Sequence, residues 1–119
     1  MADNPGTRIV TKIIFPVRDM SQAVGFYRRL GFEVENYDDG YAWVRNKGME
    51  ILHLAAAAEL TVEDNPAAGY FHVQDTDAWH GAWSDLIPDL EPVTDRPWGM
   101  REFSFKDPSG NLLRVGQNL

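Results

Sequence analysis

The side chains that could hold a ligand are aromatic, cationic and acidic, and they lie on segments with the alternating pattern of strands. The chain has no cysteine, which excludes disulfides and thiolate metal sites. It also lacks a nucleophile elbow, a phosphate-binding loop and a His–Glu metal motif. Stacking and charge pairing are the chemistry that remains, and we predict no catalytic residue. The candidate ligand-binding residues are Lys12, Tyr41, Trp43, His53, Tyr70, His72, Trp98, Glu102, Ser104 and Arg114.

Strand phase places these candidates on one surface. The expected strands cover residues 10–17, 33–37, 41–45, 50–55, 69–73, 90–93, 101–106 and 112–117. Helices are expected from Asp19 or Ser21 to about Leu30, and over about Thr76–Leu86. Each helix must cover the apolar face of a sheet, and alternation then turns the opposite side chains toward a cleft. A bulge would invert this phase over residues 41–53. The apolar set expected under the helices is Phe15, Val17, Phe71, Val73, Phe103, Phe105, Leu113 and Val115.

Two interpretations of the cleft aromatics stay open at this point. Tyr41, Trp43 and Tyr70 either stack on a flat heteroaromatic ligand or form core or dimer contacts. Trp98 is more specific, because it stands between Pro97 and Gly99 in a predicted loop. A large aromatic side chain there is expected to be covered by something else.

The chain reads as two copies of one unit. A shift of 56 positions places Phe15 on Phe71 and Asp19 on Asp75, and it also aligns four further identities. In both copies an apolar strand ends in Asp and continues into an amphipathic helix. The predicted pattern is βαβββ twice, and two such units can form a cleft between sheets. The four further identities are Val17/Val73, Gly25/Gly81, Leu30/Leu86 and Glu35/Glu91.

Length and composition predict one folded domain over residues 1–119. Residues are 44% hydrophobic and 24% charged, which is typical of a globular protein. The net charge of -7 argues against a nucleic-acid partner. It either attracts a cationic partner or only maintains solubility. Residues 1–8 carry no apolar run and nothing approaches a membrane span, so we expect a cytoplasmic protein without a membrane partner.

Several motifs resemble the vicinal oxygen chelate superfamily, which includes glyoxalases, bleomycin resistance proteins and dioxygenases. They are Gly25–Phe32 in the first unit, and Pro97–Phe103 followed by Lys106–Asn111 in the second. The segment Trp98–Phe103 is most similar to the bleomycin resistance branch. The resemblance implies an α+β fold of two tandem βαβββ modules, about 9–56 and 67–117, that form a cleft.

Enzymes of this superfamily hold a divalent metal with His, Glu or Gln on four strands. Those positions correspond here to Lys12, His53, Ala68 and Arg114. Two are cationic and Ala68 has no donor atom, so three of the four cannot be ligands. We therefore expect no metal, no cofactor and no enzymatic activity.

The resemblance then implies a metal-free protein that sequesters an antibiotic of the bleomycin class. In that branch two chains form a homodimer, and the drug lies in grooves built by both. The alternative is a metal-dependent lyase, isomerase or dioxygenase of the same superfamily. Bleomycin is cationic, whereas the cleft contains Lys12 and Arg114, so a neutral or anionic ligand also stays open.

Overall fold

The computed structural model of the protein describes residues 1–119. Its two helices are α1 (Met20–Arg29) and α2 (Thr76–Trp83), and a short 3-10 turn covers Val62–Asp64. The strands are β1 (Ile13–Val17), β2 (Glu33–Asp38), β3 (Tyr41–Asn46), β4 (Met49–Ala56), β5 (Ala68–His72), β6 (Thr94–Asp95), β7 (Met100–Lys106) and β8 (Leu112–Asn118).

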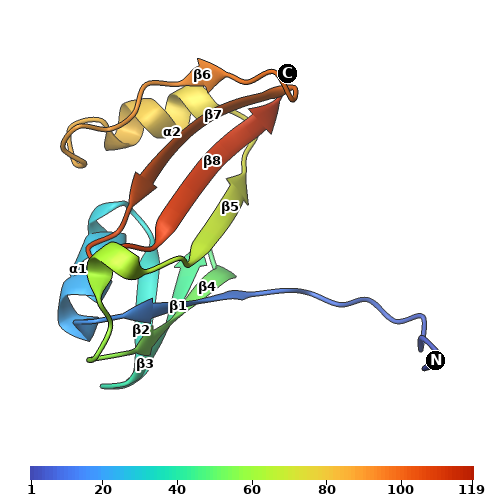
Figure 1. Cartoon of the computed structure of the whole chain (residues 1–119), viewed down its shortest axis with the longest axis vertical. Helices are drawn as coiled ribbons and strands as arrows, with labels where there is room; N and C mark the ends of the chain where they lie inside the picture. The colour runs from blue at the N-terminus through green and yellow to red at the C-terminus, as the bar shows by residue number, and fades with distance from the viewer.

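The strands form two four-stranded mixed sheets of matching topology. Sheet A has the order β1-β4-β3-β2, and sheet B has the order β5-β8-β7-β6. In sheet A, β1 pairs in parallel with β4, and in sheet B, β5 pairs in parallel with β8. All other pairs are antiparallel. Figure 1 shows sheet B above sheet A, with the N-terminal segment extending away from both. The predicted α+β fold with two βαβββ modules is confirmed.

The repeat predicted from the sequence is visible in the way both helices begin. Asp19 caps α1 by accepting a hydrogen bond from the Gln22 amide, and Asp75 caps α2 by accepting one from Ala78. A side-chain oxygen at this position satisfies a backbone donor that the first helical turn leaves free. Equivalent aspartates therefore fix where each helix leaves its strand.

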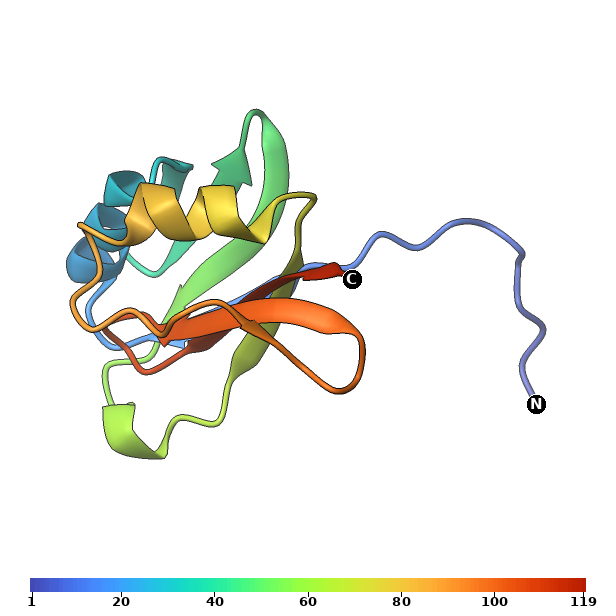
Figure 2. The same cartoon turned by 90° about the horizontal axis from the view of Figure 1, so that it is seen from above.

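The two helices share one core. Both lie on the same side of the molecule in Figure 2, and at their C-terminal ends the indole Nε1 of Trp83 donates a hydrogen bond to the Leu30 carbonyl at 2.9 Å. Tyr27, at the equivalent repeat position, is also fully buried, and its hydroxyl donates to Asp107 at 2.7 Å. Each large aromatic thus buries its ring while its polar tip keeps a partner.

The structure corrects three predicted boundaries. The first strand begins at Ile13 rather than at residue 10, since pairing with β4 starts there. The strand predicted at 90–93 is wrong, because the residues that pair with β7 are Thr94 and Asp95. The second helix ends at Trp83 rather than at Leu86, and it is Ile87 that is buried at this end, while Leu86 is 38% exposed.

Candidate functional site

Both sheets have one face under a helix and one free of helices, which we call the open face. The predicted phase is confirmed for sheet A. There Ala42, Val44, Leu52 and Leu54 are fully buried, so their neighbours Tyr41, Trp43 and His53 lie on the open face. It also holds for sheet B, where Phe103 and Val115 are fully buried and Ser104 and Arg114 alternate with the core residues.

On sheet A, three side chains form a hydrogen-bonded chain across the open face. His53 Nε2 lies 2.5 Å from a carboxylate oxygen of Glu50, and His53 Nδ1 lies 2.7 Å from the Tyr41 hydroxyl. An ionised carboxylate can only accept, so Nε2 carries a proton and donates to Glu50, while Nδ1 is paired with the Tyr41 hydroxyl. The hydrogen bond from His53 lowers the pKa of Glu50. Trp43 lies beside this chain, opposite His53 on the neighbouring strand.

On sheet B, the corresponding feature is a buried carboxylate. Glu102 is 2% exposed, and its Oε2 accepts hydrogen bonds from the Tyr70 hydroxyl at 2.8 Å and from the Trp98 indole at 3.5 Å. Burial, followed by the hydrogen bond to Glu102, raises the pKa of Tyr70 to about 12. Trp98 itself is 61% exposed, so its ring is available for stacking.

Two residues that the sequence reasoning did not select complete this group. The Arg96 guanidinium lies between Glu102, at 3.7 Å, and Glu91, at 3.0 Å. Glu91 also accepts a hydrogen bond from predicted Ser104 at 3.3 Å. One signal was present in the sequence. Glu91 is the repeat partner of Glu35, and each of the two pairs with an arginine.

Trp98 owes its exposure to a tight turn between β6 and β7. The Gly99 amide donates to the Arg96 carbonyl at 3.1 Å, and the Arg96 amide donates to Met100 at 2.7 Å. Gly99 has a φ of 85°, a conformation that other residues adopt rarely. The turn holds the backbone on both sides of Trp98, so the exposed ring is presented from a fixed hairpin.

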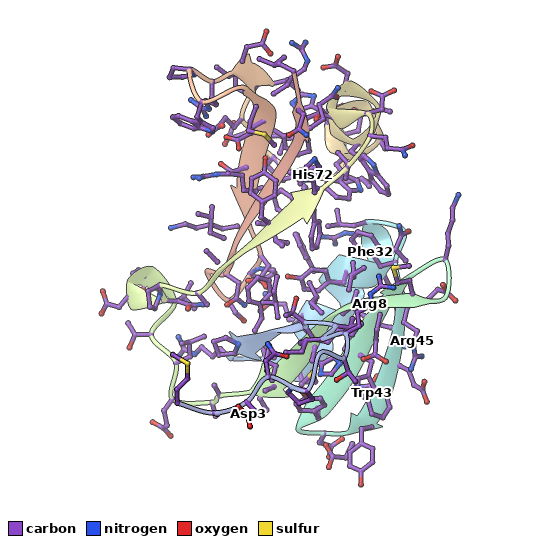
Figure 3. The ribbon with its side chains drawn as sticks, turned by 90° about the vertical axis from the view of Figure 1, so that its right-hand side faces the viewer. Asp3, Arg8, Phe32, Trp43, Arg45 and His72 are labelled. Carbon is purple, nitrogen blue, oxygen red and sulfur yellow. The ribbon has the colours of Figure 1, made fainter.

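The remaining predicted residues lie at the junction of the two sheets or at its margin. Lys12 and His72 line a cavity of about 320 Å³. Tyr70, Phe32 and other aromatic side chains line it as well. The Lys12 ammonium donates to the Glu50 carbonyl at 3.0 Å. Arg114 is exposed opposite Tyr70 and forms no ion pair. Figure 3 shows His72 on β5, apart from Trp43 and Arg45 on the other sheet.

Within one chain most of the predicted residues therefore form two hydrogen-bonded groups, one on each sheet. The sheet A group is Tyr41, Trp43 and His53 with Glu50, and the sheet B group is Tyr70, Trp98, Glu102 and Ser104 with Arg96 and Glu91. No hydrogen bond, ion pair or aromatic contact joins the two groups. Their chemistry differs as well. The first group is a chain of hydrogen-bonded side chains, and the second is a buried carboxylate beside an exposed indole.

The residues that the resemblance predicts at the superfamily's metal positions do not have the chemistry of a metal site. Lys12 and Arg114 are cationic and Ala68 has no donor, while both ring nitrogens of His53 already have hydrogen-bond partners. No three His, Asp or Glu side chains come together in a group that could hold an ion. We therefore assign no reaction step to a metal.

The fold and the two open faces fit a known family. A sequence model of the Glyoxalase/Bleomycin resistance protein/Dioxygenase superfamily matches residues 9–115. The chain belongs to this superfamily. No curated protein matches it in sequence.

Solved structures with this fold include drug binders and enzymes. A bleomycin-binding protein in complex with bleomycin has a TM-score of 0.84 at 22% identity, covering 94% of this chain and 100% of that one. The bleomycin-binding protein of Streptomyces verticillus with copper(II)-bleomycin has 0.77 at 29% identity, covering 92% and 95%. A lactoylglutathione lyase from Agrobacterium tumefaciens has a TM-score of 0.73 at 20% identity, covering 94% of this chain and 95% of that one.

Neither helix of the structure has the length and apolar character needed to span a membrane.

Proposed function

We propose that this protein binds an antibiotic of the bleomycin class and confers resistance by sequestering it, without a metal and without a chemical step. The observation that carries the proposal is the sheet B group, in which an exposed indole and a phenol border a buried carboxylate. Such a surface can stack on a flat ring system and pair with a cationic group, but it contains no nucleophile. The 29% identity with a protein solved in complex with copper(II)-bleomycin supports the choice of drug.

The proposal includes a homodimer. Ile14 on the open face of sheet A is 57% exposed, and Tyr70 and Trp98 on sheet B are 40% and 61% exposed. Apolar groups on two open faces of one chain are typical of surfaces that another molecule covers. In a twofold dimer, sheet A of one copy faces sheet B of the other, and each groove then combines both groups.

A metal-dependent lyase of the same superfamily is the competing function. It requires ligands where Lys12, Ala68 and Arg114 stand, and no described feature supplies substitutes. Elemental analysis of protein purified without chelator distinguishes the two. One equivalent of metal per chain, lost together with an activity, would favour the enzyme.

Calorimetry with metal-free and copper-loaded bleomycin tests the binding function. We expect heat of binding with at least one form, and greater drug tolerance in sensitive cells that express the protein. Trp98→Ala should weaken binding about tenfold by removing the stacking surface, with an unchanged melting temperature because the ring is exposed. Trp98→Phe keeps a ring and should lose less. No heat with either form, together with no gain in tolerance, would exclude this function.

A further inference from the structure

The buried carboxylate of Glu102 is incompletely paired. Both of its hydrogen bonds reach Oε2, and Oε1 is buried without a hydrogen-bond partner. The nearest cationic atom, Arg96 Nε, is likewise buried and has no hydrogen-bond partner. Removing a charged oxygen from water is costly unless hydrogen bonds replace the lost hydration. The site therefore has unused capacity to accept a hydrogen bond.

Arg96 does not fill this capacity. Its Nε is 3.7 Å from Oε1, whereas charge-assisted hydrogen bonds are about 2.7–2.9 Å long. Its Cζ lies 5.9 Å from the Trp98 ring, close to the outer limit of about 6 Å for a cation–π contact. The one direct hydrogen bond from its guanidinium goes to Glu91, whose side chain is 40% exposed. The tethered guanidinium is thus divided among three partners.

The backbone restricts what Arg96 can do. Its amide and carbonyl are both held in the β6–β7 turn, so the side chain reaches Glu102 from one fixed origin. A free cation has no such restriction and can place an N–H on Oε1 while it lies against the indole. Since Arg96 is 32% exposed, its side chain also has access to solvent when another cation takes its place.

We propose that Glu102, Glu91 and Trp98 form a subsite for a planar cationic group of the ligand, a guanidinium or an amidinium, and that Arg96 occupies it in the free protein. We call it the Glu102 subsite. The inference rests on the proposed drug-binding function and specifies the charge of the ligand. It also lets a cationic group enter a subsite that holds an arginine in the free protein, because Arg96 leaves when the ligand enters.

Methylguanidinium and its neutral analogue methylurea are suitable probes. The Trp98 indole N–H resonance, assigned with Trp98→Phe, reports occupancy in titrations followed by NMR. We expect a saturable shift with methylguanidinium in the native protein and none with methylurea. In Arg96→Ala the same shift should occur at about two- to fivefold lower concentration, because an internal competitor with the strength of a surface ion pair is gone.

Arg101→Ala is the matched control. Arg101 is 33% exposed and pairs with Asp77 and Asp95. This variant therefore removes one positive charge close to the subsite, from a side chain that forms no ion pair with Glu102. It should leave the methylguanidinium response unchanged. Glu102→Gln, which is nearly isosteric, should abolish the response, and its melting curve shows whether it folds.

The outcomes separate this inference from the drug-binding function. A response confined to Arg96→Ala, an equal gain in Arg101→Ala, or an equal response to methylurea would show that Arg96 and Glu102 are only a structural ion pair. A methylguanidinium response without bleomycin binding would support the Glu102 subsite and contradict the proposal that bleomycin is the ligand. Bleomycin binding that Arg96→Ala strengthens no more than Arg101→Ala would overturn the role of the subsite.

Discussion

At the scale of single residues, the sheet B group depends on a glycine, Gly116. Gly116 pairs with Glu102 and His72 across two strands, and a Cβ at this position would collide with the Tyr70 hydroxyl. The absence of that side chain lets Tyr70 lie across the strand and reach the carboxylate. Burial, and then the hydrogen bond to Glu102, raise the pKa of the Tyr70 phenol.

The pKa of Tyr70 has a consequence for stability at alkaline pH. The phenol ionises near pH 10 in the unfolded chain and at about pH 12 in the folded one. Its contribution is therefore complete below pH 10 and is lost as the pH rises toward 12. In melting curves, the advantage of the native protein over Tyr70→Phe should shrink over this interval. A difference that stays constant from pH 8 to 12 would contradict the assigned hydrogen bond.

At the scale of elements, the turn between β7 and β8 holds the two modules together. Asp107 accepts hydrogen bonds from the amides of Ser109 and Asn111, from the Asn111 side chain and from Tyr27 in α1. Asn111 in turn donates to the Pro16 carbonyl in β1. A turn in the second module thus organises groups from the first.

Asp107→Ala leaves these donors without an acceptor in a buried place. It should lower the free energy of unfolding by about 2–4 kcal/mol, because unpaired buried donors each cost about 1–3 kcal/mol and some regain partners. Urea denaturation measures this. Asp85→Ala removes an exposed aspartate that makes no hydrogen bond or ion pair, and it should change stability by less than about 0.5 kcal/mol. Equal effects of the two substitutions would show that the turn does not connect the modules.

At the scale of the whole molecule, no hydrogen bond, ion pair or aromatic contact joins the two open-face groups within a single chain, and the proposed dimer would bring them together. Sedimentation at micromolar concentration should give about twice the chain mass of 13.5 kDa. Ile14→Glu places a charge on the open face of sheet A and should yield monomers with reduced drug affinity. Leu86→Glu, at an exposed position beyond α2, should remain dimeric. A native protein that sediments as a monomer while binding bleomycin would remove the dimer from the proposal.

Much of the fold followed from the sequence, because the determining signals are local. Asp19 and Asp75 start their helices by hydrogen bonds within three residues, and strand alternation assigned Tyr70, His53 and Glu102 to the open faces. The same locality explains the errors. Nothing local at residues 90–93 reveals that β7 pairs instead with Thr94 and Asp95, since that choice is made by the hairpin turn.

What the sequence determined alone is the βαβββ repeat and the phase of its strands. These depend on residue type and on spacing along the chain. Only the tertiary structure decided that the candidate residues divide between two sheets, and that Glu102 is buried with one oxygen unpaired while Arg96 stands beside it. Burial and pairing of this kind depend on side chains from separate strands, and no periodicity in one segment records which of them will meet.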